Sequence, residues 1–528
     1  MNGALQRHWN EANHHEAARN PSAARACYEA MLAIAPDLVA PHLRLSRLAQ
    51  VADRYVDSRL HALQAARICA RIQDTKSVGF VSLRLLAFAE DAEIVGLIRS
   101  MPWSDEEVLR QAAVLAQHLW LVDRHDLALE FLTHVASRVR PDPLLCYTRA
   151  NVLRSLGRLD EATDYYEYAL RLDPDNAYVH RTLAFHQVAK PAGSRAPRIE
   201  AAYGQHADGS PERAQLRYAL FKELDDAGHT AAAWDALREG AAMVRSTLRH
   251  DPAEEERAFE RLMQSSPWAM PVRVDQAPSG PVPIFIVGLP RTGTTVLDRV
   301  LGNHPEVVSL GERNDLEAAI SEVSDHFYPG GLRESRWEKL AGIDPLTVGV
   351  RYRERLAPMI GRSRCFIDKN PRNFFNVGLI LRALPQARIL CVRRDPMDAC
   401  FSNLKELFEG GAYPYSYAFE DLAAHHRGFD RLLAHWMAEA RGAMHVVDYE
   451  ALVRSGEDTL RGILAFCGLA PAHNMLDITA NAAPVSTASS SQVRSPIHDR
   501  GIGAWRRYAV PLEPLRRMLD AQGNGHDR

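Results

Sequence analysis

The chain has 528 residues, a formal net charge of −3 and 46% hydrophobic residues. This length is too great for one ordinary domain, so we expect two or more cores. The near-neutral charge and the absence of a long basic run argue against nucleic acid as the main partner. The first residues contain no apolar signal region and no stretch approaches ~18 apolar residues, so we expect no membrane span and a cytoplasmic location.

Residues 1–265 are predicted to be helical almost throughout, because they are rich in Ala, Leu and Arg and are interrupted only by short breaks. The clearest unit spans residues 143–176. Its small residues allow two antiparallel helices to approach closely, a glycine opens the turn, a tyrosine fills the gap between pairs and a proline ends the second helix. These offsets match the tetratricopeptide pattern. The residues concerned are Ala150, Gly157, Ala162, Tyr166, Ala169 and Pro174.

Two further segments follow the same pattern less closely. One contains Ala12, Ala24, Tyr28 and Pro36, and the other spans residues 216–243. A generic stack of α-hairpins predicts nearly the same shape and is the alternative. In both cases each repeat contacts only its neighbours, and the resulting solenoid surface suits the binding or positioning of a partner. No chemistry is evident in this half.

Prolines mark a linker at residues 266–283, after which short apolar strands alternate with helical segments. This alternation predicts βαβ units and a parallel sheet, in an α/β P-loop-like domain over residues 284–522 followed by a disordered tail at 523–528. Ligands of such sheets bind at the carboxyl ends of the strands. The expected strands are residues 284–287, 365–367, 388–392 and 445–447.

A phosphate-binding loop follows the first of these strands. Residues 288–295 read Gly-Leu-Pro-Arg-Thr-Gly-Thr-Thr, the spacing of a P-loop, in which backbone N–H groups and a helix N-terminus bind phosphate. Thr294 stands where nucleotide triphosphatases carry a lysine, and Arg291 supplies a different cation. The loop therefore favours an anionic nucleotide without a triphosphate to hydrolyse; an ordinary strand-to-helix turn is the alternative. Its expected nucleotide contacts are Pro290, Arg291, Thr292, Gly293, Thr294 and Thr295.

This loop resembles the 5′-phosphosulfate loop of the sulfotransferases that use 3′-phosphoadenosine 5′-phosphosulfate (PAPS). The resemblance continues over residues 284–508. It is closest to the tyrosylprotein sulfotransferases and their bacterial relatives fused to tetratricopeptide repeats. It implies the sulfotransferase fold, PAPS as the sulfate donor and no metal.

The resemblance also implies a site for the 3′-phosphate of PAPS. The family holds this group with an arginine and a serine eight residues apart, which match Arg394 and Ser402. An arginine fork and a hydroxyl both suit a phosphate monoester. The adjacent Arg393 is the alternative in register, and a surface ion pair with Asp395 or Asp398 is the structural alternative for Arg394.

Three further positions resemble nucleotide-binding residues of the family. Tyr449 matches a tyrosine near the nucleotide, although a core aromatic residue is the alternative. Ser489 and Trp505 match a late loop that closes over the nucleotide. A basic residue precedes the tryptophan in the family, whereas this chain has alanine there, so Arg500 or Arg506 is expected to replace that cation.

Sulfuryl transfer requires a base for the acceptor and cations for the leaving phosphate. Glu312 lies twenty-one residues after Arg291, the distance at which the tyrosylprotein family places its catalytic glutamate. Lys369 lies in a Lys-Asn-Pro element that is similar to the family's Lys-x-Pro. The resemblance therefore implies Glu312 as the base, with Arg291 and Lys369 as the cations. His304 is the rival base.

These observations predict a PAPS-dependent sulfotransferase whose repeat domain positions the acceptor or docks a partner protein. A P-loop kinase or triphosphatase, and a repeat scaffold without catalysis, are the alternatives. Resemblance to the tyrosylprotein enzymes suggests a tyrosine-bearing peptide as the acceptor, and a repeat groove suits an extended chain. Glycans, lipids and small phenols stay open as acceptors.

Overall fold

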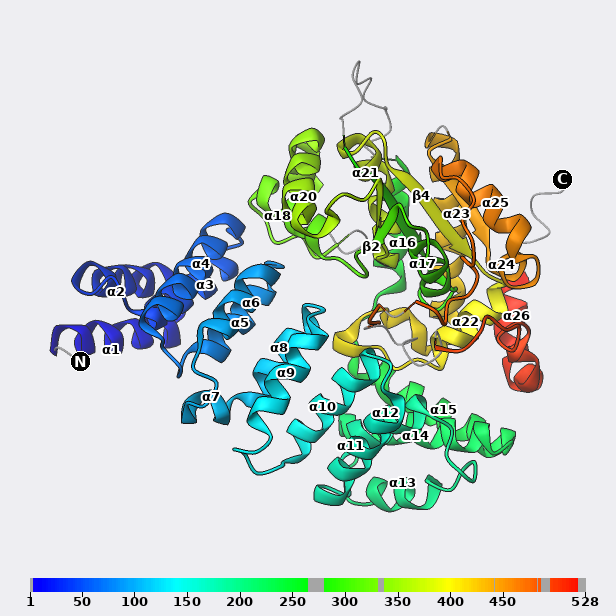
Figure 1. Cartoon of the computed structure of the whole chain (residues 1–528), viewed down its shortest axis with the longest axis horizontal. Coiled ribbons are helices and arrows are strands. Elements are labelled where there is room, and N and C mark those ends of the chain that lie inside the picture. The colour runs from blue at the N-terminus through cyan, green and yellow to red at the C-terminus, as the bar shows by residue number, and fades with distance from the viewer. Residues whose placement is uncertain are drawn as a thin grey trace. The chain divides into compact units, whose positions relative to one another are not determined.

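The computed structural model describes residues 3–264, 280–330, 337–440, 442–481, 483–485 and 494–520 (Figure 1). They pack as two compact units. The first contains the described residues of Met1–Leu156, Asn314–Pro329 and Arg336–Asp344, and the second contains the remainder. Most of the predicted linker, the predicted tail and Ser489 lie outside the described residues.

The first unit is a stack of helices. The α1 and α2 helices pair through the small residues that the repeat pattern picked out, since Ala12, Ala24 and Tyr28 are fully buried between them. The helices are α1 (Gly3–Ala17), α2 (Pro21–Ile34), α3 (Val39–Val51), α4 (Tyr55–Ile72), α5 (Val78–Leu86), α6 (Asp91–Ser100), α7 (Glu106–Arg110), α8 (Ala112–Leu121), α9 (His125–Val135), α10 (Pro143–Ser155), α18 (Asp315–Ser324) and α19 (Trp337–Ala341).

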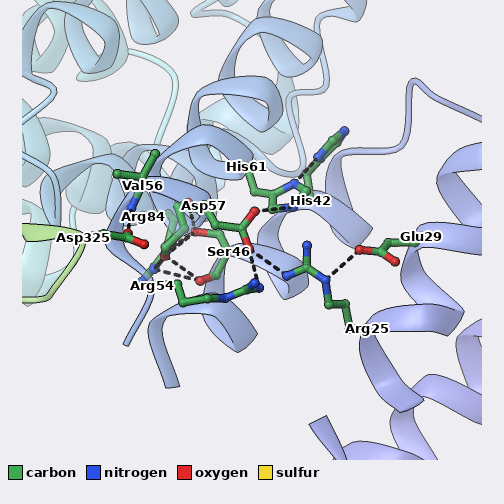
Figure 2. Close-up of polar contacts among 11 residues, drawn as sticks. Arg25, Glu29, His42, Ser46, Arg54, Val56, Asp57, His61, Arg84 and Asp325 are labelled. Carbon is green, nitrogen blue, oxygen red and sulfur yellow. Dashed lines mark hydrogen bonds and ion pairs between the residues drawn. The ribbon is translucent and has the colours of Figure 1, made fainter. Parts of the chain in front are cut away.

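Buried polar contacts fix how α3, α4 and α5 pack (Figure 2). The hydroxyls of Ser46 and Ser58 each donate to the other residue's carbonyl, at 2.7 and 2.6 Å. The guanidinium of Arg84 then donates to both serine hydroxyls at 2.7 Å. Both serines are fully buried, so these bonds satisfy groups that would otherwise be costly to bury.

A segment from the second half of the sequence completes the first unit. The carboxylate of Asp53, after α3, accepts hydrogen bonds from His326 Nδ1 at 2.7 Å, from the Phe327 N–H at 3.1 Å and from Lys339 Nζ at 2.9 Å. The ring of Phe327 packs edge-on against Tyr55, with 5.1 Å between centroids. Residues almost 300 positions apart in sequence thus form one packed unit.

In the second unit, helices from the first half of the sequence share a core with the C-terminal half. Tyr218 of α14 is fully buried and donates a hydrogen bond to the Leu404 carbonyl at 3.1 Å. Phe221, in the same core, lies near Tyr508. The domain boundaries near 265 and 284 stay predictions, and the packing does not divide the chain there. These helices are α11 (Leu159–Leu172), α12 (Ala177–His186), α13 (Ala196–Tyr203), α14 (Pro211–Asp226), α15 (Thr230–Thr247) and α16 (Pro252–Gln264).

A five-stranded parallel sheet forms the centre of the second unit, in the order β2-β3-β1-β4-β5. The four predicted strands are confirmed, and the short edge strand β2 is an addition. From β1 the chain passes to the edge strand β2, returns to β3 beside β1, and then crosses to β4 and β5 on the other side of β1. The crossing point lies between β1 and β4, and ligands of such sheets bind at a point of this kind. The strands are β1 (Val282–Gly288), β2 (Val307–Ser309), β3 (Cys365–Asp368), β4 (Arg388–Arg393) and β5 (Met444–Asp448).

The remaining helices surround this sheet. They are α17 (Thr294–Gly302), α20 (Pro345–Ile360), α21 (Val377–Ala383), α22 (Pro396–Leu404), α23 (Phe419–Glu439), α24 (Tyr449–Arg454), α25 (Gly456–Cys467) and α26 (Ala509–Asp520). Among all the described helices, none combines the length and the apolar character that crossing a bilayer would require.

Candidate active site

The loop between β1 and α17 makes a tight turn that requires glycine at two positions. Gly288 has φ 144°, and a Cβ there would lie 2.6 Å from the Val392 carbonyl oxygen. Gly293, with φ 106°, begins α17, and a Cβ there would collide with the ring of Tyr449. The Thr292 hydroxyl donates to the Leu289 carbonyl at 2.7 Å and closes the turn. The loop therefore presents main chain, at a helix N-terminus, to any ligand beside it.

Arg394, directly after β4, connects this loop to a late segment of the chain. Its guanidinium donates to the carbonyl of Arg291 at 3.0 Å and to the carbonyl of Gly501. It also lies over the ring of Tyr449, 4.8 Å from the centroid. Burial raises the pKa of Tyr449, and the positive charge of Arg394 partly offsets this increase. The Nε–H of Arg394 is buried and has no hydrogen-bond partner among the described residues.

The α22 helix supports the loop from the other side. Ser402 on this helix lines the cavity beside the loop. The neighbouring Asn403 is buried, and its side-chain amide donates to the Pro290 carbonyl at 2.9 Å. Sequence analysis missed Asn403, because no local pattern marks an amide that holds a loop more than a hundred residues away.

The late segment around residue 503 is also fixed by α22. The buried carboxylate of Asp398 accepts a hydrogen bond from the Gly503 N–H at 2.6 Å and a longer one, at 3.5 Å, from the Trp505 N–H. Asp398 was weighed only as an ion-pair partner of Arg394, and its contact with this segment was missed. Arg500 lines the cavity, whereas Trp505 and Arg506 lie outside the lining, with Arg506 5.6 Å from the centroid of the Trp505 ring.

A cavity of about 450 Å³ lies where these elements meet. Seven of the predicted nucleotide contacts line it: Arg291, Gly293, Thr294, Thr295, Arg394, Ser402 and Tyr449. Its lining carries more cationic than acidic side chains, and two of the acids, Asp398 and Asp225, already accept hydrogen bonds from protein groups. The cationic side chains are Lys222, Arg291, Arg394, Lys405, Arg500 and Arg507.

Helix α14 supplies one wall of this cavity, which sequence analysis did not predict. Phe221, Lys222 and Asp225 lie in the lining, together with Phe185 of α12. Residues 216–243 had been interpreted only as a loose repeat for binding a partner. A repeat-like helix thus takes part directly in the site.

Glu312 and Lys369 form a second group, at the carboxyl ends of β2 and β3. The Lys369 ammonium, only 2% exposed, donates a hydrogen bond to the Glu312 carboxylate, which is 49% exposed. The Lys369 N–H donates to the Gly311 carbonyl at 2.9 Å, which joins the two strand ends. Neither Glu312 nor Lys369 lines the cavity described above.

Asp298, on α17, adds a buried carboxyl near this pair. Burial raises its pKa, while the charge of Lys369 and a 2.6 Å hydrogen bond from the Ser309 hydroxyl act in the opposite direction. A carboxyl group of this kind helps to balance the buried charge of Lys369. Sequence analysis did not single it out.

Arg291, the third predicted catalytic residue, lines the cavity. Its Nε is 3.7 Å from the Glu406 carboxylate, and its φ is 65°. The three predicted catalytic residues therefore occupy two groups in this structure, the Glu312–Lys369 pair and the Arg291–Glu406 pair. His304, the rival base, is buried, and both ring nitrogens have backbone partners, the Ala470 carbonyl at 2.9 Å and the Glu306 N–H at 3.1 Å.

Comparisons with known proteins find a family profile that matches part of the chain. Residues 283–473 match the profile described as "Sulfotransferase family", and residues 143–176 match the tetratricopeptide repeat. The second half of the chain carries a sulfotransferase-family domain. Together with the parallel sheet, this match confirms the predicted fold class, a helical repeat region followed by an α/β sulfotransferase domain. No group of side chains suited to holding a metal ion occurs within the described residues.

Two known proteins are similar in sequence to parts of this chain. The chain is 25% identical, over 376 residues, to an uncharacterized protein of Aquifex aeolicus, covering 70% of this chain and 49% of that protein. It is 21% identical, over 246 residues, to protein-tyrosine sulfotransferase 2 of Gallus gallus, covering 44% of this chain and 66% of that protein. The chain thus spans about half of the first relative and about two thirds of the second.

A solved structure is also similar. The sulfotransferase domain from the Synechococcus PCC 7002 olefin synthase is 17% identical, with a TM-score of 0.34. The match covers 48% of this chain and 98% of that one.

Proposed function

We propose that this protein transfers a sulfuryl group from PAPS to an acceptor hydroxyl. The observation that carries the proposal is the cavity beside the loop, which combines a helix N-terminus, a predominance of cations and the side chains of Arg394 and Ser402 in one lining. Thr294 replaces the lysine of triphosphatases at the same loop.

The chemistry assigns one task to each of the predicted catalytic residues. The sulfur–oxygen bond to the phosphate breaks while a new bond forms between sulfur and the acceptor oxygen, and adenosine 3′,5′-bisphosphate leaves. Glu312, half exposed, is accessible to an acceptor and takes the proton of its hydroxyl. Lys369 and Arg291 offset the negative charge that develops on the leaving phosphate.

The nucleotide occupies the cavity in this proposal. Pro290, Arg291, Thr292, Gly293, Thr294 and Thr295 build the 5′ side, and Arg394 with Ser402 binds the 3′-phosphate. Tyr449 shapes the site through its contact with Gly293. Arg500 is the better candidate for the late cation because it lines the cavity. Ser489, Trp505 and Arg506 complete the proposed set of nucleotide contacts.

For the acceptor, we propose a tyrosine-bearing peptide. Support comes from the similarity to a protein-tyrosine sulfotransferase and from the tetratricopeptide repeat, a module that binds peptides and proteins. The helical half would then present the peptide or hold a partner protein. A glycan or a small phenol is the alternative acceptor.

Two measurements test the proposal. Calorimetry in EDTA should detect binding of adenosine 3′,5′-bisphosphate, whereas ATP binding that depends on Mg²⁺ would favour the kinase alternative. Incubation with ³⁵S-labelled PAPS and separate pools of tyrosine peptides, glycans and phenols should then label one pool. Glu312→Gln should abolish that label, while Glu306→Gln, which removes an exposed carboxylate paired with Arg364, should not. Absence of both binding and transfer would leave the scaffold alternative.

A further inference from the structure

Lys405 is a cavity residue for which no role has yet been derived. It caps the C-terminus of α22 and follows Ser402 by three residues, so the two side chains lie on the same face of the helix, one turn apart. Its ammonium lies over the ring of Phe401, 4.4 Å from the centroid, with the cavity on its other side.

The Lys405 ammonium has no hydrogen bond or ion pair with any residue that the structure describes. The carboxylate of Asp225, on α14, is the nearest compensating charge, but it already accepts a 2.7 Å hydrogen bond from the Tyr508 hydroxyl and lies 2.9 Å from Arg507. Burial is the main reason that the pKa of Lys405 is lowered to about 8. Lys405 is nevertheless only half-buried and lines the cavity, so an anion bound there can reach it.

The charged groups around Lys405 also favour the binding of an anion beside it. The charges of Arg291, Arg394 and Lys222 lower the pKa of Lys405, whereas the charge of Asp225 raises it. A dianion in the cavity would relieve the repulsion among these cations. The position beside Ser402 indicates which anion this is.

We propose that Lys405 binds the 3′-phosphate of the donor nucleotide, together with the Ser402 hydroxyl one helical turn earlier. This inference rests on the proposed function. It adds to the site a cation that the family resemblance did not mark. It also gives α14 a role, because Asp225 on that helix helps to keep Lys405 protonated for binding.

The test compares two nucleotides that differ only in the 3′-phosphate. Calorimetry at pH 7.5 measures adenosine 3′,5′-bisphosphate and adenosine 5′-monophosphate on the full chain. Lys405→Met should weaken the bisphosphate by about 10- to 100-fold, the usual effect of one charge-assisted hydrogen bond, and the monophosphate by less than about 3-fold. Lys76→Met removes an exposed lysine far away in sequence and serves as the matched control.

Two further readouts separate a ligand from a structural residue. The bisphosphate affinity of the natural protein should fall between pH 7.5 and 9.5, as Lys405 loses its proton, and Lys405→Arg should remove this dependence while retaining affinity. Without nucleotide, the melting temperature of Lys405→Met should equal or exceed that of the natural protein, since the variant removes one of several neighbouring cations. If Lys405→Met does not fold, the pH profile of Lys405→Arg decides.

Failure of this inference is distinct from failure of the proposed function. If the natural protein binds no bisphosphate, both are overturned. If it binds and Arg394→Ala abolishes binding, but Lys405→Met binds normally, only the role of Lys405 is overturned. An equal loss for both nucleotides in Lys405→Met would also overturn it, because the 3′-phosphate would then not be the group involved.

Discussion

Replacing Arg394 by lysine separates two roles that this residue combines. As a phosphate ligand it supplies a positive charge, which lysine retains, and a two-donor fork, which lysine lacks. As a connection between the loop and the late segment it needs two separate donors, because it hydrogen-bonds the carbonyls of both Arg291 and Gly501. A lysine ammonium is a point charge and does not reproduce the guanidinium fork that spans both carbonyls.

The size of the effect follows from these contacts. A hydrogen bond from a charged donor contributes about 1.5–3 kcal/mol, and the contact with the Tyr449 ring adds about 0.5–1 kcal/mol. Arg394→Lys should lose one carbonyl bond and part of the ring contact. Since ~1.4 kcal/mol corresponds to a tenfold change, we expect the affinity for adenosine 3′,5′-bisphosphate to fall by about 30- to 300-fold.

Calorimetry on the full chain measures this loss, and Arg393→Lys is the matched control. Arg393 is the adjacent arginine, its side chain is 51% exposed, and it lies 3.7 Å from Asp430. Its replacement should change the affinity by less than about 2-fold. Normal binding by Arg394→Lys would refute the connecting role, and a large loss in Arg393→Lys alone would show that the neighbouring arginine is the phosphate ligand.

Three other changes have defined outcomes. Glu312→Gln should lower turnover by at least about 10²-fold with unchanged bisphosphate affinity, because a proton acceptor is lost but the cavity is not touched; near-normal turnover would exclude Glu312 as the base. Asp398→Asn should weaken bisphosphate binding by about 10-fold and speed amide exchange at Gly503, and unchanged exchange would contradict its role in holding this segment. Asp53→Asn should destabilise the first unit in chemical denaturation. Burial tends to raise the pKa of Asp53, but hydrogen bonds from Lys339, His326 and the Phe327 N–H lower it to about 2. The contribution of Asp53 to stability is therefore complete above an ordinary pKa of 3.8 and is lost as pH falls towards 2. An unchanged denaturation midpoint in Asp53→Asn would refute this contribution.

The sequence predicted the features that depend on neighbouring residues. The strand, the glycine spacing and the following helix at 282–302 are encoded locally, and the structure contains all three. Arg394 and Ser402 come from the family resemblance; both line the cavity, and their role as phosphate ligands stays a prediction. The short strand β2 was missed because three residues carry too little periodicity to be recognised.

The features that were missed depend on contacts between distant segments. Asn403 belongs to no motif of the sequence, although its amide donates a hydrogen bond to the Pro290 carbonyl. Asp53 has no distinctive sequence context, and its partners at 326–339 are identified only by the fold. Neither position repeats with a period or belongs to a motif, so pattern analysis had no signal to use.

The positions of the cations in the cavity explain why the loop carries Thr294 where triphosphatases carry a lysine. A triphosphatase places a lysine within the loop because its phosphates lie in one row beside that loop. Here the cations of the cavity come from separate segments, with Arg394 after β4, Lys405 at the end of α22 and Arg500 in the late segment. Such a distribution suits a ligand whose anionic groups are separated by a sugar, and a row of phosphates at the loop would leave these cations without partners. We therefore expect this cavity to prefer adenosine 3′,5′-bisphosphate over both ADP and ATP, and a preference for ATP in calorimetry would contradict this account of the missing lysine.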